Sequence, residues 1–300
     1  MDPWWEAMRQ GDFAAAWAIS DAVLAARRAA PMLYPLPPRH LQSVWDGRAL
    51  EGKRVLVRCY HGLGDTVQFV RLLPMLRERT AHIALWAQPA LLDLLRGVGG
   101  VDRLEPLHDA EPDIERDTDV ELMELPHILR LSPERIPRRV PYLHVDGPRL
   151  PRQRPRIGLA WRAGEWNPLR SIDEAALLPL SDIHGVDWGS LQYGAASLPW
   201  PMASMACADL CEQARRMLAL DLVISVDTLF AHLAGALGLQ VWTLLPTPCD
   251  WRWMSAGNDS PWYPTMRLFR QSRPGDWHGV VEKVRVSLAS WLEKRCASAA

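Results

Sequence analysis

Short apolar runs alternate with longer amphipathic stretches along the chain from residue 54 onwards. The runs "RVLVRC" and "HIALWAQ" are short and apolar, and each is followed by a longer segment whose apolar positions recur at helical spacing. Runs of this kind predict buried strands, and the longer segments predict helices. In the first half of the chain we predict a strand over 54–59, a helix over 66–80, a strand over 82–88, a helix over 89–98 and a strand over 119–125.

The same alternation returns in the second half. Apolar runs such as "LVISVD" are again separated by helical stretches, and a final helical pattern closes the chain. Strands that alternate with helices predict parallel sheets covered by helices, so we expect two successive α/β units. The predicted elements are strands over 156–161, 187–192, 222–227 and 240–246 and helices over 175–180, 210–220, 229–238 and 279–295.

Two segments outside this alternation indicate how the chain divides. Residues 4–28 place apolar groups at helical spacing on either side of Gly11 and Asp12, which predicts one helix pair of the tetratricopeptide type. One such pair cannot bury its own apolar face, so we expect it to pack as a cap on the main body. Residues 134–156 are rich in arginine and proline and predict a solvated linker, although the arginines could instead face an anionic ligand. The expected divisions are a helix pair with its connector over 1–40, a first domain over 41–150, a second domain over 151–275 and a closing helix over 276–300.

Composition and charge narrow the class of protein. The chain has 300 residues, 48% of them hydrophobic and 23% charged, and a formal net charge of −1, which is typical of a soluble globular protein and gives no general attraction to nucleic acid. Its five cysteines contain no CxxC pair, so we expect neither a disulfide framework nor a metal site, and a reducing cytoplasm fits best. The start of the chain lacks the pattern of a signal peptide, and the most apolar region, 219–246, is interrupted by polar residues, so we expect no transmembrane segment.

The first candidate site is the loop "HGLGD", residues 61–65, which follows a predicted strand and precedes a predicted helix. Ligands of α/β sheets bind at this kind of point, where strand ends meet helix N-termini. Gly62 and Gly64 would permit unusual backbone angles and a close approach of a ligand. Asp65 with the residues after it resembles a helix capping box, so a cap and a catalytic carboxylate are equally good interpretations of Asp65 from these residues alone.

The second candidate site lies at the strand-to-helix change within "ISVDTLFAHLAGALG", residues 224–238. Ser225, Asp227 and Thr228 cluster where the strand ends, and His232 follows one helical turn later. On this pattern alone, a core or capping role for His232 is the stronger interpretation.

The third candidate site is the loop of "GLAWRAGEWNPLRSI", residues 158–172, which also follows a predicted strand. Arg162, Arg170 and Ser171 in this loop could hold a phosphate, because a guanidinium group donates two parallel hydrogen bonds to phosphate oxygens.

Taken together, these stretches resemble glycosyltransferase family 9, the heptosyltransferase-like group, as found in the transferase domain that follows tetratricopeptide repeats in many bacterial proteins. The resemblance covers about residues 40 to 290. It is carried by the glycine loop and by the following segments of the second half: "GLAW", "SLQ", "DLVISVDTLFAHLAGALG", "VWTLLP", "DWRW" and "SPWYPTMRLFRQSRPGDW".

The resemblance implies a GT-B fold, an α/β architecture of two facing Rossmann-like domains with parallel sheets. The first domain would bind the acceptor through the loop of His61, Gly62 and Gly64, the second would bind a nucleotide-sugar donor, and a C-terminal helix would pack back on the first. Asp65 would be the general base that deprotonates the acceptor hydroxyl.

The family's DT(G/A)xxH signature implies donor-binding roles for Asp227, Thr228 and His232, and Leu229 departs from the small residue usual at its position. By position, the remaining donor-binding candidates are Arg162, Arg170, Ser171 and Ser225.

The expected activity is an inverting, metal-independent glycosyltransferase that moves a sugar from a nucleotide diphosphate donor, such as ADP-heptose, to a hydroxyl. The nucleotide sugar is a co-substrate, and no other cofactor is expected. Partners would be this donor and a saccharide, a lipid-linked saccharide or a protein as acceptor. The alternatives are an inactive binding or scaffold protein of GT-B fold, with the helix pair as a docking surface, and a sugar epimerase of the same fold.

Overall fold

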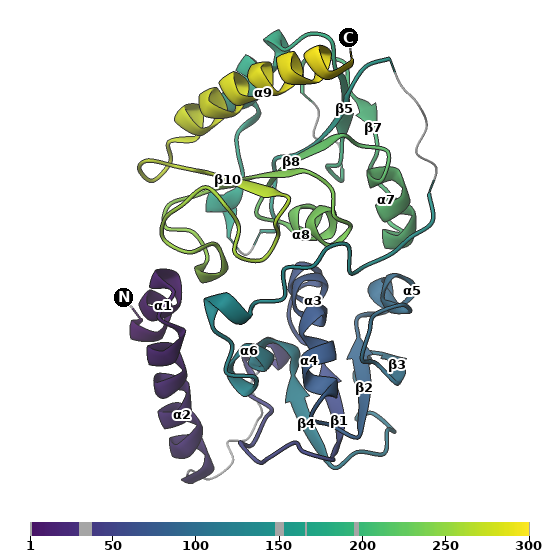
Figure 1. Cartoon of the computed structure of the whole chain (residues 1–300), viewed down its shortest axis with the longest axis vertical. Helices are drawn as coiled ribbons and strands as arrows, with labels where there is room; N and C mark the ends of the chain where they lie inside the picture. The colour runs from purple at the N-terminus through teal and green to yellow at the C-terminus, as the bar shows by residue number, and fades with distance from the viewer. Residues whose placement is uncertain (1, 30–37, 148–152, 166, 195–197, 300) are drawn as a thin grey trace. The chain divides into compact units, whose positions relative to one another are not determined.

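The computed structural model describes residues 2–29, 38–147, 153–165, 167–194 and 198–299. The chain divides into two compact units (Figure 1). Unit 1 contains residues 1–144 together with Asp250–Ser255, and unit 2 contains residues 145–249 and 256–300. The chain changes unit after residue 144 and returns briefly to unit 1 through Asp250–Ser255, which contains the "DWRW" stretch of the family resemblance.

Unit 1 is built on a parallel sheet of four strands in the order β3-β2-β1-β4. The central strands β1 and β2 are almost entirely buried, as their continuous apolar runs predicted. The sequence did not predict β3, whose residues are partly exposed. The strands are β1 (Arg54–Arg58), β2 (His82–Ala87), β3 (Arg103–Pro106) and β4 (Thr118–Glu121).

The helices of unit 1 are shorter than the sequence pattern predicted. The predicted helix over 66–80 is divided by a 3-10 turn over Val70–Leu72, because Pro74 lacks an N–H and its ring crowds the carbonyl of residue 70. The predicted strand over 119–125 ends at Glu121, whose side chain accepts the N–H of Met123 and turns the chain into a helix. The helices are α3 (Leu63–Phe69), α4 (Leu73–Arg77), α5 (Leu92–Leu95) and α6 (Leu125–Ile128).

The predicted N-terminal helix pair is confirmed as α1 (Pro3–Gln10) and α2 (Phe13–Ala29). Gly11 ends α1 with φ +79°, a left-handed angle that glycine adopts without strain. The pair packs on unit 1, because the indole N–H of Trp17 donates to the carbonyl of Leu131 over 2.7 Å and Arg130 forms an ion pair with Asp21. The connector expected over 31–40 lies mostly outside the described residues.

Unit 2 is built on a second parallel sheet, with the strand order β10-β9-β8-β5-β6-β7. Of its strands, the sequence missed β7, which has only two residues, and β10. The strands are β5 (Arg156–Ala160), β6 (Asp187–Ser190), β7 (Ala203–Ser204), β8 (Leu222–Val226), β9 (Val241–Leu245) and β10 (Met266–Arg270). Its helices are α7 (Leu210–Met217), α8 (Leu229–Ala236), α9 (Trp277–Ala299) and a 3-10 stretch over Glu174–Asp182 in place of the helix predicted over 175–180.

The C-terminal helix α9 packs on unit 2. Its apolar side chains recur every three to four positions and belong to the core that covers β5, β8 and β9. The α9 side chains in this core are Trp277, Val280, Val281, Val284 and Leu288.

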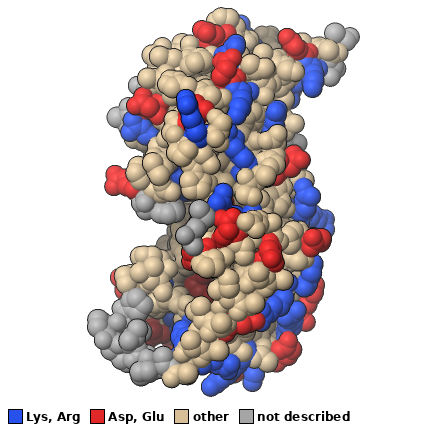
Figure 2. All heavy atoms as spheres, turned by 90° about the vertical axis from the view of Figure 1, so that its left-hand side faces the viewer, with Lys and Arg blue, Asp and Glu red and all other residues tan. Residues whose placement is uncertain are grey.

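Charged side chains are dispersed over the surface. On the face shown in Figure 2, acidic and basic residues are interspersed, in keeping with the net charge of −1. Among the described residues, no helix combines the length and the apolar character needed to cross a bilayer.

Candidate functional site

In each sheet, the strands that directly follow the first strand in sequence lie on one side of it, and a later strand lies on its other side. The strand order therefore reverses at one point of each sheet. In unit 1 this point lies between β1 and β4, and in unit 2 it lies between β5 and β8. Loops that leave neighbouring strands in opposite directions open a crevice at the carboxyl end of the sheet, which is where open α/β sheets bind ligands. The three candidate loops predicted from the sequence follow β1, β5 and β8, so all of them lie at these points.

In unit 1, the loop after β1 is tied to the end of β4. Glu121 is buried, and its Oε1 accepts the N–H of Tyr60 at 3.1 Å and lies 3.0 Å from Nδ1 of His61. Burial alone would lower the pKa of His61, but the hydrogen bond and the charge of Glu121 outweigh it and raise the pKa. Gln88 fixes the same loop by donating to the carbonyl of His61 over 2.7 Å. His61 is therefore held by Glu121 in the loop that leads to the candidate base.

Asp65 is both a cap and a member of an ion pair. Its Oδ2 accepts the N–H of Gly62 at 2.9 Å, and its Oδ1 lies 2.7 Å from Nη1 of Arg252. Asp65 is the third residue of α3, and Gly62 is the residue that precedes the helix, so Asp65 closes the first turn from inside the helix. An ionised carboxylate has about four lone-pair sites, so Asp65 can accept more than these two hydrogen bonds.

The glycines of this loop serve a different purpose from the one predicted. Gly62 has φ −67°, an angle open to any residue, and Gly64 lies within α3. A Cβ on Gly62 would lie 3.1 Å from Oδ2 of Asp65, so the missing side chain allows this carboxylate to approach the backbone.

Arg252 is the functional candidate that the sequence did not identify. It belongs to a 3-10 turn over Trp251–Trp253, and its guanidinium carbon lies 5.6 Å from the ring of Phe69 and 5.7 Å from that of Trp251. Its Nε is also 3.0 Å from Oδ1 of Asp250. The segment "DWRW" was part of the family resemblance, but no local pattern indicated which side chain Arg252 would meet.

In unit 2, the loops after β5 and β8 bring together three of the predicted residues. Nη1 of Arg170 donates to the carbonyl oxygen of Asp227 over 2.9 Å and lies 3.9 Å from its Oδ2. On the other side, Nε2 of His232 is 3.6 Å from Oδ1 of Asp227, and Nδ1 of His232 is 3.0 Å from the hydroxyl of Tyr263. All three predicted residues are largely buried, so a guanidinium, a carboxylate and an imidazole form one compact cluster.

Ser225 and Thr228 support this cluster. The hydroxyl of Ser225 donates to the carbonyl of Val226 over 2.7 Å and lies 3.1 Å from that of Thr228. The Thr228 hydroxyl in turn accepts the N–H of Phe230 at 3.3 Å, which makes Thr228 the N-cap of α8. Leu229, the residue that departs from the family signature, is the first residue of α8.

Arg162 and Ser171 line a separate hollow of about 350 Å³. Arg162 donates through Nε and Nη2 to Glu174, over 2.9 and 2.6 Å, and Ser171 accepts the N–H of Ala163 at 2.9 Å. Of the two predicted arginines, Arg170 therefore contacts Asp227 and Arg162 is paired with Glu174.

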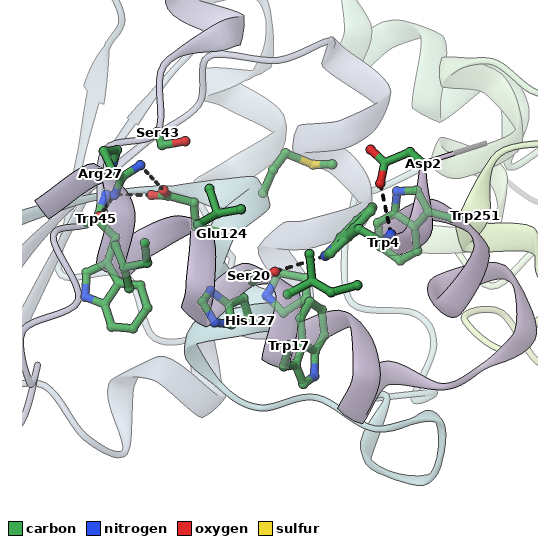
Figure 3. A pocket seen from close by; sticks show the side chains of 15 residues that line it. Asp2, Trp4, Trp17, Ser20, Arg27, Ser43, Trp45, Glu124, His127 and Trp251 are labelled. Carbon is green, nitrogen blue, oxygen red and sulfur yellow. Dashed lines mark hydrogen bonds and ion pairs between the residues drawn. The ribbon is translucent and has the colours of Figure 1, made fainter. Parts of the chain in front are cut away.

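A second hollow, of about 410 Å³, lies in unit 1 between the helix pair and the body (Figure 3). Aromatic side chains from both parts line it, among them Trp4, Trp17, Trp45, His127 and Trp251. Within the described ranges, no group of three or more His, Cys, Asp or Glu side chains is placed to hold a metal ion.

Comparison with known proteins gives the context of this geometry. No protein-family model matches the chain. Protein FlbA of Caulobacter vibrioides is 26% identical over 307 aligned positions, which cover 87% of this chain and 50% of FlbA. The chain therefore spans about half the length of this curated relative.

Several solved structures have a similar fold. The glycosyl transferase family 9 protein of Veillonella parvula matches with a TM-score of 0.51 at 13% identity, over 75% of this chain and 87% of that one. The ADP-heptose LPS heptosyltransferase II of E. coli matches with 0.52 at 15% identity, over 81% and 99%. The heptosyltransferase TibC of enterotoxigenic E. coli matches with 0.55 at 12% identity, over 78% and 67%. At these identities the likeness concerns the fold, and the chain has the GT-B fold of the family 9 glycosyltransferases, as its sequence predicted.

Proposed function

We propose that the chain is a glycosyltransferase that moves a sugar from a nucleotide diphosphate donor to an acceptor hydroxyl with inversion at the anomeric carbon. The observation that carries the proposal is the pair of differently charged sites at the two sheet crevices. Unit 1 presents the carboxylate of Asp65, and unit 2 presents the cluster of Arg170, Asp227 and His232 beside the N-terminus of α8.

The chemistry assigned to unit 2 is donor binding. The N–H groups that open α8 and the guanidinium of Arg170 favour an anion, and a nucleoside diphosphate is the anionic part of the donor. As the bond between the anomeric carbon and the diphosphate oxygen breaks, its electron pair stays on that oxygen. Fixed cations and dipoles stabilise this developing charge, so the proposed step does not call for a metal ion.

The chemistry assigned to unit 1 is activation of the acceptor. The acceptor oxygen forms the new bond to the anomeric carbon on the face opposite the leaving diphosphate, and its proton passes to Asp65. Arg252 favours the ionised form of this carboxylate, which is the form that accepts a proton. The hydroxyl becomes acidic only as its bond to carbon forms, so a modest base is sufficient.

The donor and the acceptor are proposed at the level of class. ADP-heptose is the first donor to test, because two proteins of the same fold are described as an ADP-heptose transferase and as a heptosyltransferase in complex with ADP-heptose. A saccharide, a lipid-linked saccharide and a protein side chain remain the proposed acceptor classes.

The test is a transfer assay with the purified chain. ADP-, UDP-, GDP- and TDP-linked sugars are combined with acceptors of the three classes, and nucleoside diphosphate release and acceptor mass are measured together. We expect release that depends on the acceptor, and an acceptor heavier by one glycosyl residue. Binding of a donor without transfer to any acceptor would favour a scaffold protein, and conversion of the donor in the absence of an acceptor would favour an epimerase.

A further inference from the structure

The N-terminal helix pair packs against the segment that carries Arg252. The N–H of Ser255 donates to the carbonyl of Arg9, in α1, over 2.8 Å. The ring of Trp4, also in α1, meets Trp251 edge-on, with 5.8 Å between the ring centroids. Residues 250–255 thus belong to unit 1 although unit 2 supplies the chain on both sides of them. The helix pair provides part of the surface that holds this short segment in unit 1.

Trp251 connects this contact to the surroundings of the candidate base, Asp65. Its other neighbour is Phe69 of α3, at 6.1 Å in a stacked arrangement, and Phe69 lies one helical turn after Asp65. The guanidinium of Arg252 lies near both rings, and Nη1 of Arg252 reaches Oδ1 of Asp65 at 2.7 Å. The ring of Trp251 thus lies in contact with Trp4 and Phe69 and beside the Arg252 guanidinium.

Trp4 is itself fixed by α2. Figure 3 shows Trp4 between Trp251 and Trp17, with its indole directed at Ser20. The indole N–H donates to the hydroxyl of Ser20 over 3.0 Å, and the ring centroid is 6.5 Å from that of Trp17. Trp17 is buried against the body of unit 1. A continuous path of packed rings thus runs from the body of unit 1 through the helix pair to the Arg252 segment.

We propose that the helix pair is a functional part of the catalytic site, in which Trp4 positions Arg252, through Trp251, so that Arg252 keeps Asp65 oriented. This inference rests on the proposed function, because it assigns a role within the same site. It makes Trp4 a positioning residue, since Trp4 acts only through Arg252. It also gives the helix pair a role other than docking a partner.

The most direct test follows the titration of Asp65 itself, which requires no substrate. The chain is labelled with ¹³C at the aspartate carboxyl carbons, and the signal of Asp65 is assigned by its absence in Asp65→Asn. The charged groups that surround this carboxylate are Arg252, His61 and, behind Arg252, Asp250. We expect the midpoint of Asp65 to rise by about one unit in Arg252→Gln, because a neighbouring cation is lost, and by roughly half a unit in Trp4→Ala.

Two controls separate positioning from general loosening of the fold. Trp45→Ala removes another tryptophan of the same hollow, one that packs on His127 at 5.5 Å, and should leave the Asp65 midpoint unchanged. In an Arg252→Gln background, Trp4→Ala should add no further shift, because Trp4 acts through Arg252. If Trp4→Ala does not fold, Trp4→Leu keeps an apolar side chain while removing the ring. A wild-type midpoint in the folded Trp4 variant, or equal shifts in the Trp4 and Trp45 variants, would overturn the proposal.

The transfer assay then separates this proposal from the proposed function. We expect Trp4→Ala to lower kcat about fivefold at an unchanged KM for the donor, because a slightly misplaced base slows the chemical step without touching donor binding. If the wild-type chain transfers no sugar, the proposed function fails, while the titration still decides whether Trp4 positions Arg252. If transfer occurs and Trp4→Ala leaves kcat unchanged, the catalytic role of the helix pair is excluded even if the midpoint moves.

Discussion

The two units place their candidate residues at equivalent points of two parallel sheets but gather different charges there. In unit 1 the carboxylate of Asp65 contacts Arg252, and that of Glu121 contacts His61. In unit 2 a single carboxylate, Asp227, lies between Arg170 and His232 at the start of a helix. The shared topology provides the position of a site, and the residues in the loops decide its chemistry.

Under the proposed function, this difference gives each unit its own task. A carboxylate that an arginine keeps ionised suits a base. A buried guanidinium beside a helix N-terminus suits an anion. The comparison can therefore be tested by removing a charged group at one site. The function assigned to that site and the function assigned to the other site are then both measured.

The largest expected effect comes from Asp65→Asn. The amide keeps the size of the side chain but cannot take up a proton, so transfer should fall by about a hundredfold or more. Donor binding and the free energy of unfolding should stay close to wild-type values. The matched control is Asp250→Asn, which alters another carboxylate beside Arg252 and should change transfer far less. Near-normal turnover in Asp65→Asn would show that Asp65 serves only as a helix cap.

The next effect should come from the two arginines of unit 2. Arg170→Ala removes the guanidinium that contacts Asp227, and we expect donor affinity to fall about thirtyfold, in line with the loss of a charged hydrogen-bonding group. Arg162→Ala is the control, because Arg162 is paired with Glu174 in a different hollow, and it should change donor affinity less than about twofold. Calorimetric titration with the donor measures both. Equal losses would mean that the donor lies along the hollow of Arg162 as well.

A smaller effect is expected for Gly235→Ala in α8. A Cβ at this position would lie 2.4 Å from Cδ1 of Tyr263, so the ring that holds His232 has to move. Overpacking of this kind should lower the free energy of unfolding by about 1–3 kcal/mol and weaken donor binding as well. Gly97→Ala, whose Cβ would meet no atom within 4 Å, is the matched control. Urea denaturation of both variants checks the expectation, and equal stability of the two would show that Tyr263 does not fix His232.

The smallest effect concerns the charge of His61. Because its pKa is raised in the fold, its stabilising contribution is present below the unfolded value of about 6.5 and is lost as the pH rises through the folded value. The difference in unfolding free energy between wild type and His61→Gln should therefore shrink as the pH rises above about 6.5, by less than about 1 kcal/mol for this partly exposed group.

His127 provides a control of opposite sign for the His61 experiment. Burial of the His127 ring lowers its pKa against the opposing effect of Asp21, so the contribution of His127 is present at high pH and is lost as the pH falls. The difference between wild type and His127→Gln should therefore grow as the pH rises toward about 6.5 and stay level above it. Urea denaturation at a series of pH values measures both, and parallel trends for the two variants would contradict the assignment of His61 to Glu121.

Much of the fold was accessible from the sequence because the central strands are continuous apolar runs. β1, β2, β5, β8 and β9 were all predicted, whereas β3 and β10 were missed. β3 carries charged and partly exposed residues, so its composition resembles that of a loop. The break in the helix after β1 depends on Pro74, and the packing of α9 depends on which apolar core its stripe completes. Local sequence patterns do not specify which core the apolar stripe of a helix will join.

The candidate site shows the same limit. Asp65 and Asp227 could be selected because each lies where an apolar strand gives way to a helix, and His232 could be selected through the family signature. The partner of Asp65 could not, because Arg252 is 187 positions away and reaches it only through the return of residues 250–255 to unit 1. Arg162 and Arg170 look equivalent in the sequence, and only the geometry shows that Glu174 engages the first and Asp227 the second.

The central claim, that unit 2 binds a nucleotide diphosphate sugar, is tested most directly by thermal unfolding with a panel of nucleotides. Wild type, Asp227→Ala and Asp65→Asn are unfolded with ADP, UDP, GDP, TDP and their sugars. At about a hundred times the dissociation constant, a ligand stabilises by roughly 2.7 kcal/mol, which should raise the Tm of a 300-residue chain by about 4 °C. We expect this rise with one nucleotide class in wild type and Asp65→Asn, and its loss in Asp227→Ala. No rise with any nucleotide, or a rise that survives in Asp227→Ala, would contradict the assignment of the donor site.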